Sequence, residues 1–526
     1  LQINSRDLFY LNLESFKKSQ SFLIFMISIE EMSTFCKKKG FVYRSSDIYG
    51  GYAGFFDYGP LGVELFNAIK SSWWKFFVHN HSNMVGIDAS IISHPKTWEA
   101  SGHLDSFGDL LLVCSKCKSK YRADHFIEEK LDVVADGMEA DAVNKIILEK
   151  KLSCPLCKGK FNELKDFNLL FETSVGASKD SSSKAFLRGE TAQGIFMDFK
   201  QIAETARVKL PFGIAQVGRC FRNEISPRDF LFRSREFHIG EFEFFIHPDE
   251  TKCPELTKKH LSLKLNILDA KTQDNGKKDL KEMTIKEMLK KKMLDEWHAY
   301  WLAEQYNWLL SIGISSKSLK VREHVSNELS HYSSATLDID YAFPFGSKEL
   351  LGIANRGQYD LNQHIKHSKQ KLELFDEESK KKVVPRVIEP TFGMERVFLA
   401  VLYEAYKDDK KRGNIVLKLD HSLTPIKLGI LPLVNKNRGK AEAIFDKVKT
   451  EFVSFYDKAG SVGRRYARAD EQGVPYCVTV DFDEGVTIRD RDSTKQIRIS
   501  EDKLIPTLHK LLNQEVQFEK AGKLVK

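Results

Sequence analysis

Arginines and glutamates gather in residues 218–245, where their spacing suits chemistry on a charged ligand. The apolar runs Phe212–Phe221 and Phe237–Ile246 predict two strands, and the loop between them contains Pro227. A guanidinium group binds phosphate through its planar fork, and a carboxylate binds an ammonium group. The hairpin therefore predicts a site for a ligand that carries both groups, unless its charges form only solvated salt bridges. Its charged residues include Arg222, Glu224, Arg228, Arg233 and Arg235.

The second strand of this hairpin has two unlike faces, because side chains alternate with a period of two. Phe242, Phe244 and Ile246 form an apolar face that can pack on a core. Glu241 and Glu243 fall on the other face, where burial costs free energy unless each carboxylate has a partner. The pattern therefore places acidic side chains beside the basic loop.

The order of these residues resembles a known family. Arg222-x-Glu224, a basic loop and then Arg235-Glu236-Phe237 are similar to motif 2 of class II aminoacyl-tRNA synthetases. The run FRNEISPR before REF is similar to the dimeric glycyl-tRNA synthetases. The resemblance implies an α/β (α+β) catalytic domain, in which helices flank an antiparallel sheet. It also implies a zinc-ribbon-like insertion and a C-terminal mixed α/β anticodon-binding domain.

A helix rich in aromatic residues follows the segment Gly54–Gly62. Apolar residues between Val63 and Phe77 recur at helical spacing, so this stripe must be buried in the fold or against a partner. An ordinary core helix explains the pattern. In the resembled family the helix belongs to motif 1 and builds the interface of a homodimer, which we therefore expect here.

Two later segments extend the resemblance to the nucleotide site. Gly346–Gly357 contains ELLGIANR, and Ile388–Arg396 resembles motif 3, whose following helix favours anions at its N-terminus. The implied catalytic residues are Arg222 on the α-phosphate of ATP, Glu349 on Mg²⁺ and Arg396 on the terminal phosphate. Phe237 is expected to stack under adenine. The implied ATP-binding residues are Arg222, Asn223, Glu224, Phe232, Arg233, Ser234, Arg235, Glu236, Phe237, Glu349, Leu350, Gly393, Met394, Glu395 and Arg396.

The resemblance also implies a glycine site. In LRGETAQGIF, Glu190 is expected to bind the substrate ammonium group together with Glu241 and Glu389. Gly189 stands where the family has proline, which loosens the backbone, and Thr391 stands where most relatives have serine. Arg122 of an Arg-Ala-Asp run is implied to lie in the substrate site, although alone it would be a surface arginine. The implied glycine-binding residues are Arg122, Glu190, Phe237, His238, Ile239, Gly240, Glu241, Glu389, Pro390, Thr391, Phe392 and Gly393.

Four of the eight cysteines form two Cys-x-x-Cys pairs, Cys114 with Cys117 and Cys154 with Cys157. Four thiolates suit the tetrahedral shell of structural zinc. The 36 residues between the pairs exceed the usual spacing of about 15 to 20. The pattern therefore predicts a zinc site, with reduced unliganded cysteines and disulfides as the alternatives.

The chain divides into three predicted parts. Residues 1–30 form an unassigned N-terminal extension, and 31–424 form the catalytic domain, with a Cys-rich insertion at 110–165 and a helical insertion at 251–330. Strands and helices alternate in 425–526, which predicts a small α/β domain. Its Gly463–Glu471 and Ile488–Ser493 segments resemble the family's anticodon-binding domain, where arginines meet phosphates and Tyr466 stacks on a base. Taken alone, these charge runs are solvated faces.

Composition sets the outer limits. The 526 residues carry a net charge of +8, with 42% hydrophobic and 29% charged residues, as expected for a mildly basic globular protein of about three domains. No apolar run reaches the roughly 18 residues that span a bilayer. The short run Phe22–Ile29 lacks a small-residue cleavage site after it, which argues against a signal peptide. We expect a cytoplasmic protein.

The resemblance implies a glycine–tRNA ligase that activates glycine with ATP and Mg²⁺ and transfers it to tRNA(Gly). A rival hypothesis is a non-catalytic RNA-binding or regulatory protein derived from such an enzyme. A class II synthetase for another amino acid is a third, disfavoured because three acidic residues are present and no side-chain ligand is evident.

Overall fold

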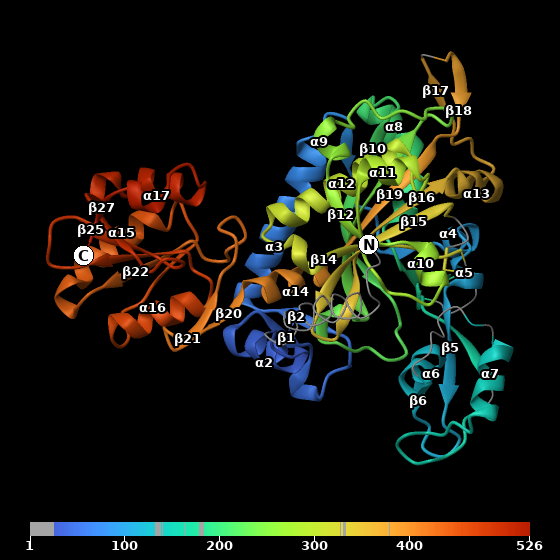
Figure 1. The fold of residues 1–526 in the computed structure, drawn as a ribbon, viewed down its shortest axis with the longest axis horizontal. Helices are drawn as coiled ribbons and strands as arrows, with labels where there is room; N and C mark the ends of the chain where they lie inside the picture. Colours follow the sequence, from blue (N-terminus) through green and yellow to red (C-terminus); the bar gives the residue numbers. More distant parts are fainter. Residues whose placement is uncertain are drawn as a thin grey trace, which may run out of the picture.

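The structure is a computed structural model that describes residues 26–131, 138, 140–162, 164–177, 183–326, 328–329, 333–377 and 379–525. Most of the expected N-terminal extension therefore lies outside the described residues. Figure 1 shows a large central body, a C-terminal domain at the left in orange and red, and a small module at the lower right in teal. Among the described residues, no helix has both the length and the apolar character needed to cross a membrane.

The central body is built on a nine-stranded sheet with the order β13-β12-β14-β15-β16-β19-β11-β10-β3. Neighbouring strands run antiparallel except in the pairs β10–β3 and β12–β14. The antiparallel sheet predicted for the catalytic domain is therefore confirmed. The strands are β3 (Met84–Gly86), β10 (Phe212–Phe221), β11 (Glu236–Ile246), β12 (Lys264–Leu268), β13 (Lys281–Thr284), β14 (Leu319–Glu323), β15 (Ala335–Phe343), β16 (Gly346–Gly357) and β19 (Arg386–Gly393).

One face of this sheet is covered by three helices. They are α3 (Pro60–Trp74), which continues as a π-helical turn, α12 (Glu296–Ser311) and α14 (Met394–Ala405). The Trp73 ring contacts Phe242 and Phe392, with ring centroids 6.2 and 5.4 Å apart. The aromatic stripe of α3 is thus buried mainly in its own chain, although Val63 remains 42% exposed. The stripe is explained as a core helix and by itself requires no partner.

The opposite face of the sheet carries the acidic side chains. The predicted hairpin is confirmed as β10 and β11, and Glu241 and Glu243 are both buried. The helices α8 (Ala192–Ala206) and α13 (Tyr359–Ser368) lie on this side, where Phe199 of α8 packs on Phe245 at 4.4 Å. The face predicted to be acidic is therefore sealed from water rather than exposed to it.

Residues 251–330 differ from the predicted helical insertion. They contain α9 (Lys258–Leu261), α10 (Ala270–Asp274), α11 (Ile285–Lys290) and α12, but also β12, β13 and β14, which extend the central sheet. Leu265 and Ile267 are buried between exposed Lys264 and Asn266. Such short alternating runs, set among many lysines, hide the strand period in the sequence.

The teal module contains the Cys-x-x-Cys pairs (Figure 1). A sheet of β5 (Gly108–Val113), β6 (Lys120–Arg122) and β7 (Lys165–Asn168) packs with α6 (Ala123–Leu131) and α7 (Ala140–Glu149). Its small core is separate from the main one and consists of Leu112, Ala123, Phe126, Ile127, Val143 and Ile147. A second small sheet joins β4 (Ile92–Ser93), β8 (Phe171–Ser174) and β9 (Lys184–Leu187).

The C-terminal domain is a six-stranded mixed sheet with helices, as predicted. One of its helices ends at Val448, and a strand begins at Ser454. The strands are β22 (Leu428–Pro432), β23 (Ser454–Tyr456), β24 (Tyr476–Val480), β25 (Val486–Asp490), β26 (Gln496–Ile499) and β27 (Lys523–Leu524). The helices are α15 (Arg438–Val448), α16 (Val462–Glu471) and α17 (Leu504–Leu512).

Three arginines of this domain are buried, whereas the resemblance predicted that they contact RNA. Arg465, Arg489 and Arg491 are buried, with 3%, 7% and 1% exposed. Arg489 binds both oxygens of Asp470 at 2.8 and 2.9 Å, and Arg491 donates to the carbonyl oxygen of Leu419 at 2.8 Å. The prediction that these arginines meet RNA phosphates is wrong, because their donors stabilise the domain and its junction.

The remaining elements are short. They are α2 (Ile29–Lys39), β1 (Val42–Arg44), β2 (Phe56–Tyr58), α4 (Pro95–Ala100), α5 (His103–Ser106), β17 (Leu374–Asp376), β18 (Lys381–Val383), β20 (Tyr406–Asp409) and β21 (Asn414–Leu417).

Candidate active site

A cavity of about 160 Å³ lies where β10, β11, β16 and β19 meet the loop after β10. The two predicted catalytic arginines, Arg222 and Arg396, both line it, together with Glu349. The cavity thus brings together residues separated by more than a hundred positions in the sequence. Its lining consists of Arg222, Glu224, Leu231, Phe232, Arg233, Ser234, Phe237, His238, Ile239, Glu349, Thr391, Gly393, Glu395 and Arg396.

Five residues of the implied ATP set lie outside this lining. Leu350 and Met394 are completely buried in the apolar core, and Glu236 pairs with Arg219 at 2.6 Å. The backbone N–H of Asn223 donates to the carbonyl oxygen of Leu169, and the Arg235 side chain donates to the carbonyl oxygens of Glu224 and Ala53. These five residues therefore do not line the cavity, and the side chains of Leu350, Met394, Glu236 and Arg235 make contacts elsewhere.

The cationic side of the cavity is fixed by ring contacts and ion pairs. The Arg222 guanidinium lies over the rings of Phe107 and Phe237, 5.0 and 5.5 Å from their centroids. Its Nε donates to the carbonyl oxygen of Gly189 at 3.1 Å. This placement leaves the guanidinium oriented by aromatic faces, which hold a cation without neutralising it.

The second arginine is paired with the carboxylate predicted to hold magnesium. Arg396 binds Glu349 at 2.9 Å and lies 4.5 Å from the centroid of the Phe232 ring. On the opposite wall, Glu224 accepts a hydrogen bond from Arg233 at 2.8 Å. Glu224 and Glu349 therefore each face an arginine, whereas the third lining carboxylate, Glu395, lies 2.8 Å from Nδ1 of His238.

Beneath this cavity lie the three carboxylates predicted to bind an ammonium group. Glu190 is 3.1 Å from Nε2 of His103 and accepts from Gln193 at 2.9 Å. Glu241 accepts from the amide and hydroxyl of Thr191 at 3.1 and 2.5 Å. It also accepts from the Thr391 hydroxyl at 3.0 Å, so the residue that replaces serine keeps the hydrogen bond.

The third carboxylate, Glu389, is held by an arginine that the sequence reasoning had not given a role. Arg356 is 2% exposed and donates to Glu389 at 2.7 Å. It also binds both oxygens of Asp360, each at 2.8 Å. His103, Gln193 and Asp360 were missed as well. Three of these four residues lie in short runs of the sequence: His103 in ASGH, Gln193 in ETAQG and Arg356 in GIANR. Only the fold shows that they converge.

Burial and like charges shift the pKa values of these groups. Burial raises the pKa of Glu241, and the neighbouring Glu190 adds to the increase. Burial also raises the pKa of Glu389 well above its ordinary value, and Arg356 offsets only part of this. Glu190 behaves differently, because His103 and Arg356 outweigh burial and lower its pKa. The cluster therefore combines one strongly ionised carboxylate with carboxyl groups that retain protons more readily.

The rest of the implied glycine set divides into three groups. Phe237, His238, Ile239, Thr391 and Gly393 line the cavity. Gly240 faces Trp73 and Met394 on the apolar side, Phe392 is buried in the core, and Pro390 pairs with Ile353 inside the sheet. Arg122 lies in the Cys module, where Asp124 binds its guanidinium at 2.6 Å.

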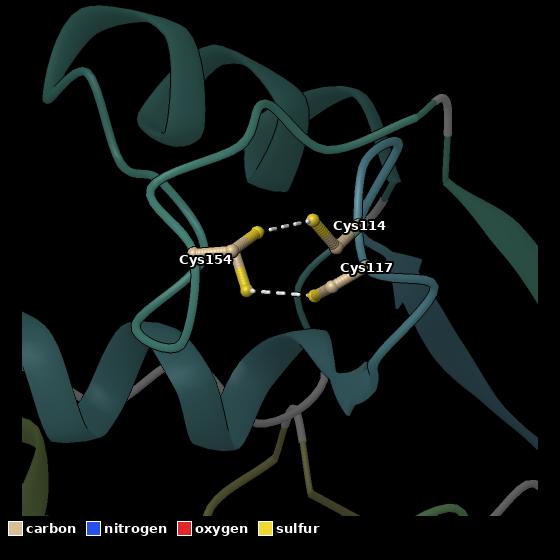
Figure 2. Close-up of side chains that lie close together, drawn as sticks. Cys114, Cys117 and Cys154 are labelled. Carbon is tan, nitrogen blue, oxygen red and sulfur yellow. Dashed lines mark hydrogen bonds between the residues drawn. The ribbon is translucent and has the colours of Figure 1, made fainter.

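The four predicted metal ligands form one cluster (Figure 2). The sulfur of Cys114 is 3.4 Å from that of Cys157, and the sulfur of Cys117 is 3.6 Å from that of Cys154. All four sulfurs lie within 4.8 Å of one another, and all eight cysteines are free. The disulfide alternative is wrong, because a disulfide needs about 2.05 Å. Four thiolates around zinc would lie about 3.8 Å apart, which this arrangement fits.

Comparisons with known proteins agree with this geometry. Residues 176–406 match the family described as the tRNA synthetase class II core domain (G, H, P, S and T), and residues 427–511 match the anticodon binding domain. A glycine–tRNA ligase of Acetivibrio thermocellus is 43% identical over 491 residues, which cover 91% of this chain and 97% of the relative. The chain belongs to the glycine–tRNA ligase family.

Other members of this family are similar to the chain over almost their whole length. The glycine–tRNA ligase of Alkaliphilus oremlandii is 41% identical over 93% of this chain and 99% of the relative. That of Bacillus thuringiensis subsp. konkukian is 40% identical over 94% of this chain and 100% of the relative. The family and class II fold that the sequence motifs predicted are thereby confirmed.

Proposed function

We propose that this protein is a glycine–tRNA ligase, which forms glycyl-adenylate from glycine and ATP and transfers glycine to the 3′ end of tRNA(Gly). The observation that carries the proposal is one site with two unlike halves. Arg222 and Arg396 line an open cavity, and Glu190, Glu241 and Glu389 lie in a buried cluster below it. Phosphates and an ammonium group are the charges that these halves complement.

In the activation step, an oxygen of the glycine carboxylate attacks the α-phosphorus of ATP in line with the departing pyrophosphate. One P–O bond forms to glycine and one breaks to pyrophosphate. Arg222 neutralises charge on the α-phosphate, and Arg396 binds the terminal phosphate. Phe237 stacks under adenine, and Glu224 accepts from its amino group. The protein supplies no nucleophile, so its contribution is positioning and electrostatic stabilisation.

Magnesium fits the carboxylate edge of this cavity. Glu349 has a side chain that is 46% exposed, so its oxygens are accessible to a cation bound to phosphates. When bound there, Mg²⁺ would neutralise charge on the leaving pyrophosphate. We propose Glu349 as its protein ligand.

In the transfer step, the terminal hydroxyl of the tRNA attacks the carbonyl carbon of the adenylate, and AMP leaves. We propose residues 31–424 as the catalytic domain and 425–526 as the domain that binds the anticodon. Support for the second assignment comes from the family match of residues 427–511. The exposed Arg464 on α16 remains available for RNA, unlike the buried arginines around it.

We propose that Thr391, which lies beside Glu241 in the cavity lining, helps to exclude amino acids larger than glycine. Thr391 contributes a methyl group to the cavity lining and keeps its hydroxyl on Glu241. A substrate side chain would have to displace packed groups, and steric exclusion of this kind discriminates strongly. The two rival hypotheses have less support, because the cavity retains both arginines and the carboxylates leave no evident ligand for a larger side chain.

We also propose that the protein acts in the cytoplasm, where tRNA is charged. Its eight free cysteines agree with a reducing compartment. This proposal of a cytoplasmic location does not depend on the geometry of the active site.

Zinc is the metal we propose for the four-cysteine site. The ligand set and the sulfur separations fit a closed structural site, whose metal would stabilise the small teal module. Freshly purified, reduced protein should contain about one zinc per chain by mass spectrometry of its metals. Cys154→Ser should lower this content strongly, whereas Cys253→Ser, outside the module, should leave it unchanged. Metal-free wild-type protein with full activity would contradict the proposal.

We infer a homodimer. Its support comes from exposed apolar side chains, since the aromatic stripe of α3 is buried mainly in its own chain. Ile48, Tyr49 and Tyr52, before α3, are 88%, 88% and 79% exposed, and Val63 of α3 is 42% exposed. Such residues favour a protein interface. Sedimentation at micromolar concentration should give a dimer, and Tyr49→Asp with Tyr52→Asp should shift it toward monomer. A wild-type monomer under these conditions would disprove the inference.

Glycine-dependent exchange of pyrophosphate into ATP tests the function and its ammonium site together. Wild-type protein should catalyse the exchange with glycine and far less with alanine. Glu241→Gln keeps the size of the side chain and removes its charge, which is worth roughly 1.5–3 kcal/mol. Glycine activation at subsaturating glycine should therefore fall about ten- to a hundredfold, while the KM for ATP changes little.

The matched control for this variant is Glu282→Gln on β13, an exposed residue of the same sheet that pairs with Lys264. It should leave the exchange unchanged. If Glu241→Gln has normal glycine dependence, or loses only affinity for ATP, Glu241 belongs to the scaffold or to the nucleotide site. Absence of any glycine-dependent exchange in wild-type protein would refute the function itself.

A further inference from the structure

Glu243 is the one carboxyl group of the buried acidic face that has no role in the site described above. Its side chain is 0% exposed, and within the described residues neither of its oxygens has a hydrogen-bond partner. Both other carboxylates nearby, Glu241 and Glu389, accept clear hydrogen bonds. A completely buried carboxyl group with two unpartnered oxygens requires an explanation, because burial of an unpaired charge is very costly.

The sheet register places Glu243 directly behind the ammonium site. Glu241 pairs with Thr391 across β11 and β19, so two residues further along Glu243 lies opposite Glu389. Carboxylate oxygens of Glu241, Glu243 and Glu389 all lie within 4.8 Å of one another. Like charges directly opposite each other in adjacent strands destabilise a sheet. At least one of these groups must therefore be neutral.

Glu243 is the best candidate for the neutral group. Arg356 binds Glu389 and Asp360, and Thr191 binds Glu241, whereas no described side chain donates to Glu243. Burial raises its pKa well above the ordinary value, and the adjacent Glu389 adds to this. On the side of β10, Glu243 lies opposite the apolar Ile214. Arg356 opposes these effects without outweighing them, so the surroundings of Glu243 favour its protonated form.

We propose that Glu243 is a positioning residue for the glycine site: a neutral carboxylic acid that directs its proton toward Glu389 and fixes that carboxylate in place. Glu389 then keeps one oxygen on Arg356 and presents its charge to the substrate ammonium group. In this role Glu243, which is 0% exposed, acts through Glu389 and touches no substrate itself. This inference rests on the proposed function. It adds a hydrogen-bond donor, Glu243, to the three carboxylates already assigned to the glycine site.

Two variants of similar volume test this role. Glu243→Gln retains a hydrogen-bond donor without a charge, and Glu243→Met retains the volume without a donor. Exchange of pyrophosphate into ATP is measured at varied glycine and at varied ATP. Glu243→Met should raise the KM for glycine about tenfold or more, as expected for a lost hydrogen bond to a charged group. The KM for ATP should change less than about threefold, and Glu243→Gln should restore the KM for glycine to within about threefold of wild type.

Gln305 of α12 provides the matched control. It is also completely buried with an unpartnered oxygen, and it donates to Gly352 from the other face of the same sheet. Gln305→Met should lower the melting temperature without a selective change in the KM for glycine. Melting temperatures of all variants separate loss of folding from loss of positioning.

Two results would overturn the inference while wild-type exchange stays normal. If Glu243→Met has the glycine KM of wild type, Glu243 does not position the site. If Glu243→Gln is as impaired as Glu243→Met, the ionised carboxylate is required. Should Glu243→Met fail to fold, the Gln variant alone decides, because a tenfold increase in its KM for glycine contradicts a neutral group. Loss of glycine-dependent exchange in wild-type protein would instead refute the proposed function.

Discussion

The charge balance around Arg356 is the constraint on which the site depends. One buried guanidinium binds Asp360 and Glu389 at 2.7–2.8 Å, with Glu190 at 3.9 Å. Buried carboxylates without such a cation would be strongly destabilising. Removing the arginine would leave several negative charges in the middle of the largest sheet. The acidic face therefore depends on Arg356 of β16, which Asp360 of α13 holds in place, and the raised pKa values of Glu241, Glu243 and Glu389 favour their neutral forms.

This constraint explains the unequal faces of the central sheet. On one side, aromatic rings of α3 and α12 pack on Phe242, Phe244 and Phe392, which gives a large rigid core. That rigidity keeps β11 and β19 in register, and the register places Glu241 beside Thr391. The same strands then present their charged residues on the opposite side. Stability and charge recognition are thus built on alternate residues of the same strands.

The sequence motifs were sufficient to predict the family, the antiparallel sheet and most residues of the cavity. They succeeded where the local order of residues determines the structure, as in the hairpin of β10 and β11. The motifs did not predict the parts of the site that depend on contacts between residues far apart in the sequence. Arg356, His103 and Asp360 have no local pattern that shows they converge on Glu190 and Glu389. Arg489 and Arg491 of the C-terminal domain gave the opposite error, because a charged run looks solvated in sequence even when a guanidinium has a buried partner.

The most direct test of this account is to count the protons that the enzyme releases or takes up when glycine binds. In the free enzyme, burial and like charges raise the pKa of Glu241 and Glu389, so these groups keep protons to higher pH than ordinary glutamates do. The ammonium group of glycine should lower those pKa values, since an opposite charge favours the ionised form. Calorimetric titration at pH 7 in two buffers of different ionisation enthalpy should then reveal release of up to about one proton per site. Glycine binding with no net release, or with proton uptake, would contradict the account.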